Sequence, residues 1–231
     1  MKKLAFTIAI LCKYTPTLSQ VLIALVFGEK LQSETLTFGL NVTPTFSTIS
    51  NLNGSTKRGL GLGLYFDIKL SKNFFLHPEA LPKSSLGVEQ LPAYPTGIDS
   101  LDTFFSNGHV QRNVRAISLP LLCRYRIDGL LFIELGPQID WILKVRDIYQ
   151  TDVNGDEATY TTDISEQFTR FDVGIAGGLH YKLKKDKGMG LGVRYFYGLT
   201  DIMKAYEDKQ VNQALYMTVM IPVGTGKSAG G

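Results

Sequence analysis

Acidic and basic side chains of this 231-residue chain recur at every second position of several apolar segments. Asp67 and Lys69 share one face of such a segment, and so do Arg124 and Arg126. Charges held in a water-poor interior are stabilised by pairing with each other. The pattern therefore predicts an interior network of salt bridges, with a path for protons or small ions as the alternative. The residues expected to face this interior are Asp67, Lys69, Glu79, Lys83, Arg124, Arg126, Glu134, Asp140, Lys144, Arg170, Asp172, His180, Lys182 and Arg194.

Motifs for other chemistry are incomplete. Gly224 to Ser228 reads GTGKS, but the earlier glycine of a phosphate-binding loop is replaced by Ile221 and no helix is expected to follow, so a bound nucleotide is not predicted. Residues 152–157 place oxygen ligands at the first, third and fifth positions of a calcium loop. The glycine stands at the fourth position rather than the sixth. A solvated turn is expected there, with incidental surface calcium as the alternative.

The histidines and glycines do not predict a cofactor or metal site. His77 and His109 offer no close ligand spacing, and we expect His180 to be hydrogen-bonded within the interior network. Several glycines are spaced at strand period and open no helix, so they are not a dinucleotide fingerprint. Their expected role is to leave room for long interior side chains. These glycines are Gly59, Gly61, Gly63, Gly190 and Gly192.

The elements that carry these residues are β-strands. From Phe171 to Leu183 the odd positions are apolar, while the even positions are small, charged or histidine. Period two is the strand signature. The pattern restarts at Met189 with large apolar residues on one face and glycines with Arg194 on the other. Bulky residues facing lipid and small or charged residues facing a crowded lumen explain both faces of a membrane barrel.

Eight such strands can be placed between residues 35 and 223, which predicts an all-β fold. Pro78 and Pro82 predict a bulge in the third strand. Long polar connections, including 86–111 and 146–167, alternate with short turns. This alternation predicts an eight-stranded antiparallel transmembrane β-barrel, an up-and-down meander with periplasmic termini and external long loops. The predicted strands are 35–46, 58–70, 74–84, 112–126, 131–144, 171–183, 189–198 and 213–223.

The two ends of the chain differ from the barrel. Met1-Lys2-Lys3 and the apolar run after them predict a signal peptide over residues 1–19, with an uncleaved leader or a soluble start as alternatives. Residues 20–34 are expected to form a short N-terminal periplasmic segment, and residues 224–231 a flexible C-terminal tail. Cys123 is expected to be a small hydrophobic residue that faces lipid.

The composition limits the classes of partner that can be expected. A net charge of +3 without a stripe of basic residues argues against nucleic acid. The expected partners are outer-membrane lipid and the machinery that assembles outer-membrane barrels.

Several stretches resemble the PorT-like family of outer-membrane β-barrel domains. They are the leader with VLIALVFGEKL, FFLHPEAL, AISLPLLCRYRI, FIELGPQI, FDVGIAGGL and GLGVRYFYGLTDI. The resemblance implies an eight-stranded barrel in the outer membrane of a Gram-negative cell, without established catalytic residues. The founding member is associated with protein secretion to the cell surface. One departure is the C-terminus, IPVGTGKSAGG, where such barrels commonly end on an aromatic residue.

The combined expectation is a non-enzymatic barrel with a structural or binding role through its external loops, above all 86–111 and 146–167. One alternative is an accessory component of a surface-secretion system. Another is a lipid-modifying barrel enzyme, which would require His109 or a loop serine. The structural rival is a soluble lipocalin-like barrel, which would turn its bulky face inward.

Overall fold

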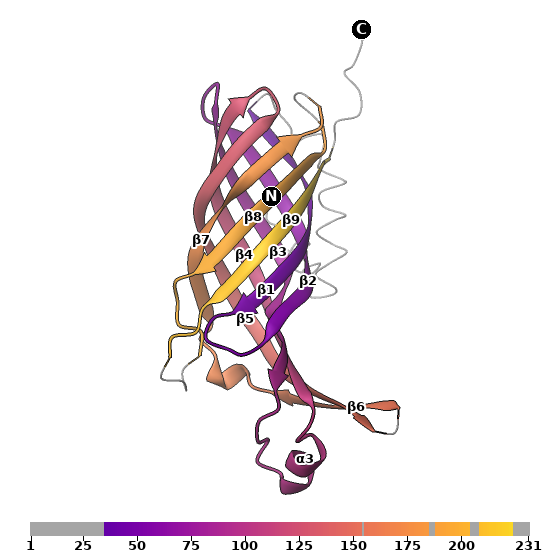
Figure 1. The fold of residues 1–231 in the computed structure, drawn as a ribbon. Coiled ribbons are helices and arrows are strands. Elements are labelled where there is room, and N and C mark those ends of the chain that lie inside the picture. The colour runs from indigo at the N-terminus through magenta and orange to yellow at the C-terminus, as the bar shows by residue number, and fades with distance from the viewer. Residues whose placement is uncertain (1–34, 154, 185–187, 204–207, 224–231) are drawn as a thin grey trace, which may run out of the picture.

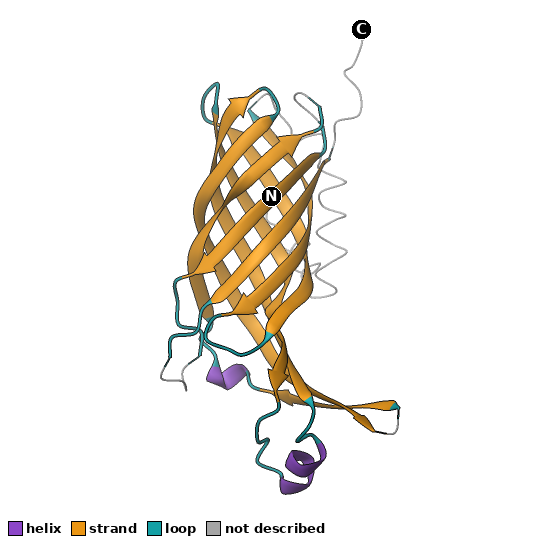
Figure 2. Ribbon diagram, in the orientation of Figure 1, coloured by secondary structure: helices purple, strands orange, loops and turns teal. Residues whose placement is uncertain are grey.

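The computed structural model describes residues 35–153, 155–184, 188–203 and 208–223. The expected signal peptide, the segment 20–34 and the tail 224–231 lie outside the described residues. The fold consists of long tilted strands wound into a barrel, with a smaller group of elements beyond one end (Figures 1 and 2). The elements are β1 (Leu36–Ile49), β2 (Ser55–Lys69), β3 (Phe74–Pro92), α3 (Asp99–Phe104), β4 (His109–Asp128), β5 (Leu131–Val153), β6 (Asp156–Asp163), the 3-10 helix η1 (Ser165–Gln167), β7 (Phe171–Lys182), β8 (Gly190–Gly198) and β9 (Asn212–Pro222).

Eight of the nine strands close into a ring. The order around the ring is β1, β2, β3, β4, β5, β7, β8 and β9, and every neighbouring pair is antiparallel. β9 pairs with β1, for example at Val42 and Val219, and so removes the free edges of the sheet. The predicted eight-stranded meander is therefore confirmed. β6 lies outside the ring and pairs only with β5 in the described part of the chain.

The strands alternate between an apolar outer face and a polar inner face. Leu135 is 61% exposed and its neighbour Glu134 is buried. On the outer wall Trp141 stacks against Phe171 with ring centroids 6.3 Å apart, as in an interfacial aromatic girdle. The bulky face therefore points outward, which excludes the lipocalin-like rival. No helix within the described ranges is long and apolar enough to cross a membrane.

Both of the long predicted loops contain strand residues, and the second is mostly strand. β3 continues to Pro92 and β4 begins at His109, so only residues 93–108 connect them, with α3 in between. The segment 146–167 likewise continues β5 and forms a hairpin with β6. These strand residues were predicted to be loop because the segments are rich in polar residues. The inward positions Val88 and Val110 are nevertheless fully buried. The first connection, expected to reach Lys57, is only residues 50–54.

The bulge expected in β3 is present. Leu62 of β2 pairs with Lys83, whereas Leu64 pairs with Ala80, so β3 carries an extra residue opposite Gly63. A β-carbon added at Gly63 would lie 2.0 Å from the carbonyl oxygen of Ala80. Glycine is therefore required here because the neighbouring backbone approaches too closely for any side chain.

Gly63→Ala is expected to destabilise the barrel by about 1–3 kcal/mol, since a backbone atom cannot rotate away from the added methyl. Gly177→Ala is the matched control, because the closest atom to its β-carbon would be the side-chain end of Leu135, at 3.0 Å, and the nearest backbone atom, the carbonyl oxygen of Glu134, would lie at an ordinary 3.5 Å. Urea unfolding of the two refolded variants measures the difference. Equal midpoints for the two variants would contradict the close approach at Gly63.

Candidate functional site

The inward positions of β5 provide a depth scale for the interior. From the end with the short turns they read Phe132, Glu134, Gly136, Gln138, Asp140, Ile142, Val145, Asp147 and Tyr149. Charged, polar and apolar layers therefore follow one another along the barrel axis. An eight-stranded barrel is just wide enough for such side chains to fill it.

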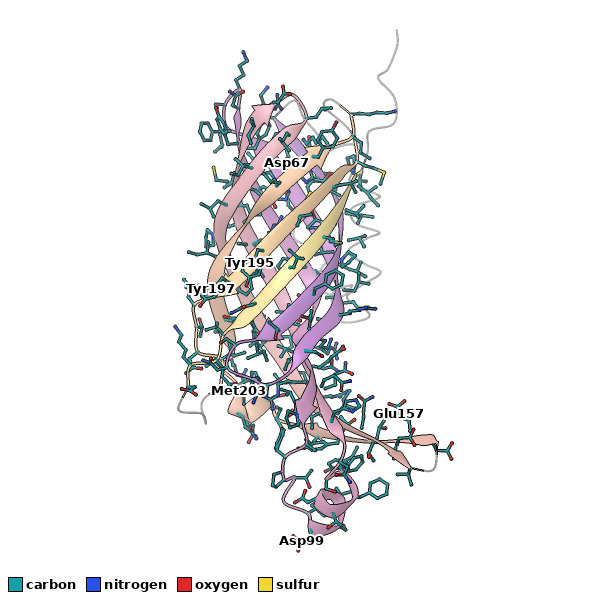
Figure 3. All side chains as sticks on the ribbon, in the orientation of Figure 1. Asp67, Asp99, Glu157, Tyr195, Tyr197 and Met203 are labelled. Carbon is teal, nitrogen blue, oxygen red and sulfur yellow. The ribbon has the colours of Figure 1, made fainter. Side chains whose placement is uncertain are left out.

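The layer around Glu134 is a closed ring of hydrogen-bonded charges, which we call the ionic cycle. Its members come from five strands and are all buried. Asp67, one of these members, is labelled in Figure 3 and shows the level of the ionic cycle in the barrel. In order of contact, the members are Asp67, Arg124, Glu134, Arg194, Glu79 and His77.

The two arginines join the carboxylates of the ionic cycle. Arg124 donates through Nε to Glu134 at 2.7 Å and through Nη1 to Asp67 at 3.1 Å. Arg194 donates through Nε to the other oxygen of Glu134, also at 2.7 Å. Its two terminal nitrogens contact both oxygens of Glu79, at 2.7 and 3.0 Å. Each guanidinium thus bridges two carboxylates, which offsets the cost of burying the charges.

His77 closes the cycle between two carboxylates. Its Nδ1 lies 2.6 Å from Asp67 and its Nε2 lies 2.7 Å from Glu79. Ionised carboxylates only accept hydrogen bonds, so this arrangement suits an imidazolium that donates from both nitrogens. Lys182 and Asn41 complete the layer, at 3.3 Å from Asp67 and 2.9 Å from Glu79 respectively.

The remaining predicted interior residues have varied positions. Arg126 lies at the short-turn mouth with its guanidinium 4.9 Å from the ring centre of Phe75. His180 is buried, and a β-carbon at Gly190 would lie 2.2 Å from its ring, so this glycine does make room for it. Asp140 and Asp172 are fully buried nearer the other end.

Four predicted interior residues do not face the interior. Lys69 ends β2 and is exposed at the rim, and Arg170 is exposed because it precedes the first residue of β7. Lys83 lies in the β3 bulge, which turns it outward. Leu143 is an extra residue in β5, so Lys144 faces outward and pairs with the exposed Asp163 at 3.0 Å. Bulges reverse the alternation of faces, and a strict period of two does not anticipate them.

His77 and Asn41 are interior residues absent from the predicted network. Both lay on polar faces of their predicted strands, with His77 two positions before Glu79. Neither residue type carries an obligatory charge, so the two residues were not included in a network predicted from paired charges. Their position on the same strand faces as the charged residues could have identified them as interior residues.

A second polar layer surrounds Asp140 and Asp172, which face each other across the β5–β7 pair. Gln138 donates through Nε2 to both oxygens of Asp140, at 3.0 and 3.1 Å. The same nitrogen lies 3.1 Å from the hydroxyl of Tyr216. Asn212 donates to Asp172 at 2.8 Å. The hydrogen bonds that reach the two carboxylates therefore come from neutral groups rather than from lysine or arginine in the described residues.

Beyond the ring, the extensions of β3, β4 and β5 join β6 in a projecting sheet, and α3 lies on the connection between β3 and β4, apart from the tip of the β5–β6 hairpin (Figure 1). Its base is held by Arg112, which donates to both oxygens of Asp147 at 2.9 and 2.7 Å. Tyr94 donates its hydroxyl to the same carboxylate and so ties the α3 connection to the sheet. Apolar side chains such as Val88 and Val110 pack around this base.

Tyr94→Phe is expected to loosen the α3 connection by about 1.5 kcal/mol, near the lower end of the range for a hydrogen bond to a charged group. Burial and the neighbouring Asp147 carboxylate raise the pKa of Tyr94 far above its ordinary value, so the contact is complete at neutral pH and is lost only in strong alkali. Proteolysis within residues 93–108 should accelerate about tenfold. Tyr125→Phe, on the exposed wall, is the control and should leave the rate unchanged.

The outer part of the projecting sheet is acidic. Figure 3 shows Asp99 and Glu157 on its two arms, far from the barrel. Arg112 is buried in the pair with Asp147, so it does not offset this exposed charge. The exposed acidic residues of α3 and of the outer part of the β5–β6 hairpin are Asp99, Asp152, Asp156 and Glu157. Asp163, at the ring end of the hairpin, is paired with Lys144.

The outer membrane protein beta-barrel domain family matches residues 29–204. The chain belongs to this family. Membership agrees with the lipid-facing wall and makes the protein an integral component of the outer membrane. No sequence among the curated proteins matches the chain.

Three solved outer-membrane barrels are similar to this family member in overall form. Ail of Yersinia pestis, solved with the heparin analogue sucrose octasulfate, is 9% identical with a TM-score of 0.44, over 82% of this chain and 99% of that one. Neisserial surface protein A is 11% identical with a TM-score of 0.41, over 81% and 99%. OprG of Pseudomonas aeruginosa is 14% identical with a TM-score of 0.38, over 81% and 91%. None of these likenesses bears on function.

Proposed function

We propose that this protein is a non-enzymatic outer-membrane barrel that binds a basic partner outside the cell through its projecting sheet. The observation that carries the proposal is an acidic edge strand. β6 pairs on one side with β5, and its other edge has no strand partner in the described residues. An extended segment can add to such an edge through backbone hydrogen bonds. The acidic residues Asp156 and Glu157 would select a segment rich in lysine or arginine.

The proposed orientation places the projecting sheet outside the cell and both termini in the periplasm. The turns at 70–73 and 129–130 are short and lie at the opposite end of the barrel. Gly39 and Pro222, near the two ends of the described chain, pair at that same end. Short turns face the periplasm in bacterial outer-membrane barrels.

Cysteine labelling tests this orientation in a Cys123→Ser background. A membrane-impermeant maleimide added to intact cells is expected to label Ser106→Cys and to leave Lys72→Cys unlabelled until the outer membrane is permeabilised. Both native residues are exposed, at opposite ends of the barrel. Labelling of only Lys72→Cys in intact cells would show that the orientation is reversed.

Binding is tested with oligolysine as the probe and with the protein reconstituted in lipid vesicles. The test variant shortens the β5–β6 hairpin by joining Tyr149 to Tyr160 through Asn-Gly. This is feasible because the two tyrosines pair directly. We expect it to lose most oligolysine binding, and we expect wild-type binding to weaken as salt is raised. Lys144→Gln is the control outside the hairpin tip. Wild-type protein that does not bind oligolysine would overturn the proposed partner class.

The proposed role is non-enzymatic and the proposed lumen is closed. The ionic cycle fills the barrel at the level of Glu134, which supports a plug rather than a path for ions. Within the described chain, no histidine is hydrogen-bonded to a serine hydroxyl, so a Ser-His arrangement for lipid modification lacks support. Planar-bilayer recordings are expected to show no steady conductance.

The PorT-like relationship and a role beside a secretion system are retained as a second candidate. The observation that favours them is the set of sequence blocks that includes FDVGIAGGL and GLGVRYFYGLTDI. Co-purification of secretion subunits with the native protein tests this candidate. Outer-membrane lipid and the barrel assembly machinery remain the proposed partners of the wall.

A further inference from the structure

Two buried carboxylates face each other in the barrel interior. Asp140 of β5 and Asp172 of β7 are directly opposite residues, and both are 0% exposed. Among the described residues neither forms an ion pair, although five carboxylates elsewhere do. Two like charges in an interior require compensation by protons or by a cation.

The neighbouring amides leave further oxygens without partners. Gln138 and Asn212 turn their amide nitrogens toward the carboxylates, as acceptor-only groups require. Their amide oxygens, Oε1 and Oδ1, are buried and have no hydrogen-bond partner in the described part of the chain. The same is true of Oδ1 of Asp172. Such buried acceptors are rare unless water or an ion completes them.

We propose that this oxygen-lined layer binds a hard cation, with Ca²⁺ as the best match. Directly opposite residues have their β-carbons about 4.5–5.5 Å apart, a spacing that one ion can bridge with Ca–O distances of about 2.3–2.6 Å. Asp140 and Asp172 supply two negative charges, and Gln138 and Asn212 supply neutral oxygens. No group of three or more His, Cys, Asp or Glu residues suited to a metal occurs in the described residues, so the amide oxygens are essential to this site.

The residues around this layer indicate an ion that stays bound and stabilises the fold, rather than one that passes through the lumen. The ionic cycle closes the lumen on the side of Glu134, and Ile142, Phe168 and Ile202 are buried in the apolar cluster toward the projecting sheet. The ion would therefore enter during folding and exchange slowly afterwards. It would join β5 to β7 just before β5 leaves the ring to pair with β6.

Refolding with and without the ion tests the proposal. Full-length protein is refolded into detergent with EDTA or with CaCl₂, and its thermal unfolding is followed. We expect Ca²⁺ to raise the Tm by about 5–10 °C, as saturating ligand does for a chain of this size. Asp163→Asn, which removes an exposed carboxylate, should keep this response, and Asp172→Asn should lose it.

Terbium provides an independent readout, because Tb³⁺ substitutes for Ca²⁺ and its emission is sensitised by a nearby tyrosine. Tyr216 contacts Gln138 and is therefore placed to sensitise it. We expect emission from wild-type protein refolded with Tb³⁺ and little from Asp172→Asn or from Asp140→Asn/Asp172→Asn. The double variant removes both charges and should still fold, as its heat-modifiable mobility would show.

Two results would overturn the proposal. One is an equal Tm in EDTA and CaCl₂ together with no sensitised emission from wild type, which would mean that the carboxyls share a proton. The other is an undiminished response in a folded Asp140→Asn/Asp172→Asn variant, which would place the ion elsewhere, for example on the acidic hairpin.

Discussion

Glu134→Gln is expected to destabilise the barrel by about 3–5 kcal/mol, the range found when one partner of a buried ion pair is removed. Glu134 is the only member of the ionic cycle that accepts from both arginines, Arg124 and Arg194. Glutamine keeps the volume but removes the charge, so two buried guanidiniums lose the carboxylate that they share. Because the residues lie on β4, β5 and β8, and β8 pairs with neither of the other two strands, the loss weakens contacts that cross the lumen.

Urea unfolding of the refolded protein, followed by the fluorescence of Trp141, measures this loss. The matched control is Lys144→Gln, which breaks an exposed ion pair with Asp163. Exposed pairs contribute about 0–1 kcal/mol, so the control midpoint should hardly move. Equal effects of Glu134→Gln and Lys144→Gln would show that the ionic cycle does not stabilise the fold.

Leu135→Arg is expected to cost about 2–4 kcal/mol, the range for arginine at the bilayer midplane. Leu135 is 61% exposed and lies near the middle of the β5 segment that pairs with β7. Its side chain faces lipid, so arginine there must either be buried in hydrocarbon or thin the bilayer. Refolding equilibria in lipid vesicles measure the cost.

The comparison for Leu135→Arg is an arginine at a different depth in the membrane. Val173 also faces outward, but it follows Phe171 by two residues and so lies near the girdle formed with Trp141. Val173→Arg should therefore cost only about 0–1 kcal/mol if that position is interfacial. Ala176→Ser, which faces the lumen, should be mild. A larger cost at Val173 than at Leu135 would mean that the membrane level has been misplaced.

The period-two pattern in the sequence was sufficient to predict the eight-stranded ring and most inner and outer faces. Along β7, for example, Asp172 and His180 are inside while Ile175 and Leu179 are outside, as expected. Alternation is a local property of an extended chain, so one strand reveals it without its neighbours. For the same reason, all six members of the ionic cycle could be placed on polar faces from their own strands alone, and five of them were predicted to belong to the network.

Only the tertiary structure decided which of these polar residues meet. Glu79 and Arg194 are 115 positions apart and join through the closure of the ring, and Asp140 lies opposite Asp172 rather than opposite a lysine or arginine. The bulges that turn Lys83 and Lys144 outward, and the pairing that converts 146–163 from loop to hairpin, also depend on neighbouring strands. Register and bulges are set by hydrogen bonding between strands, and that information is not contained in any single segment.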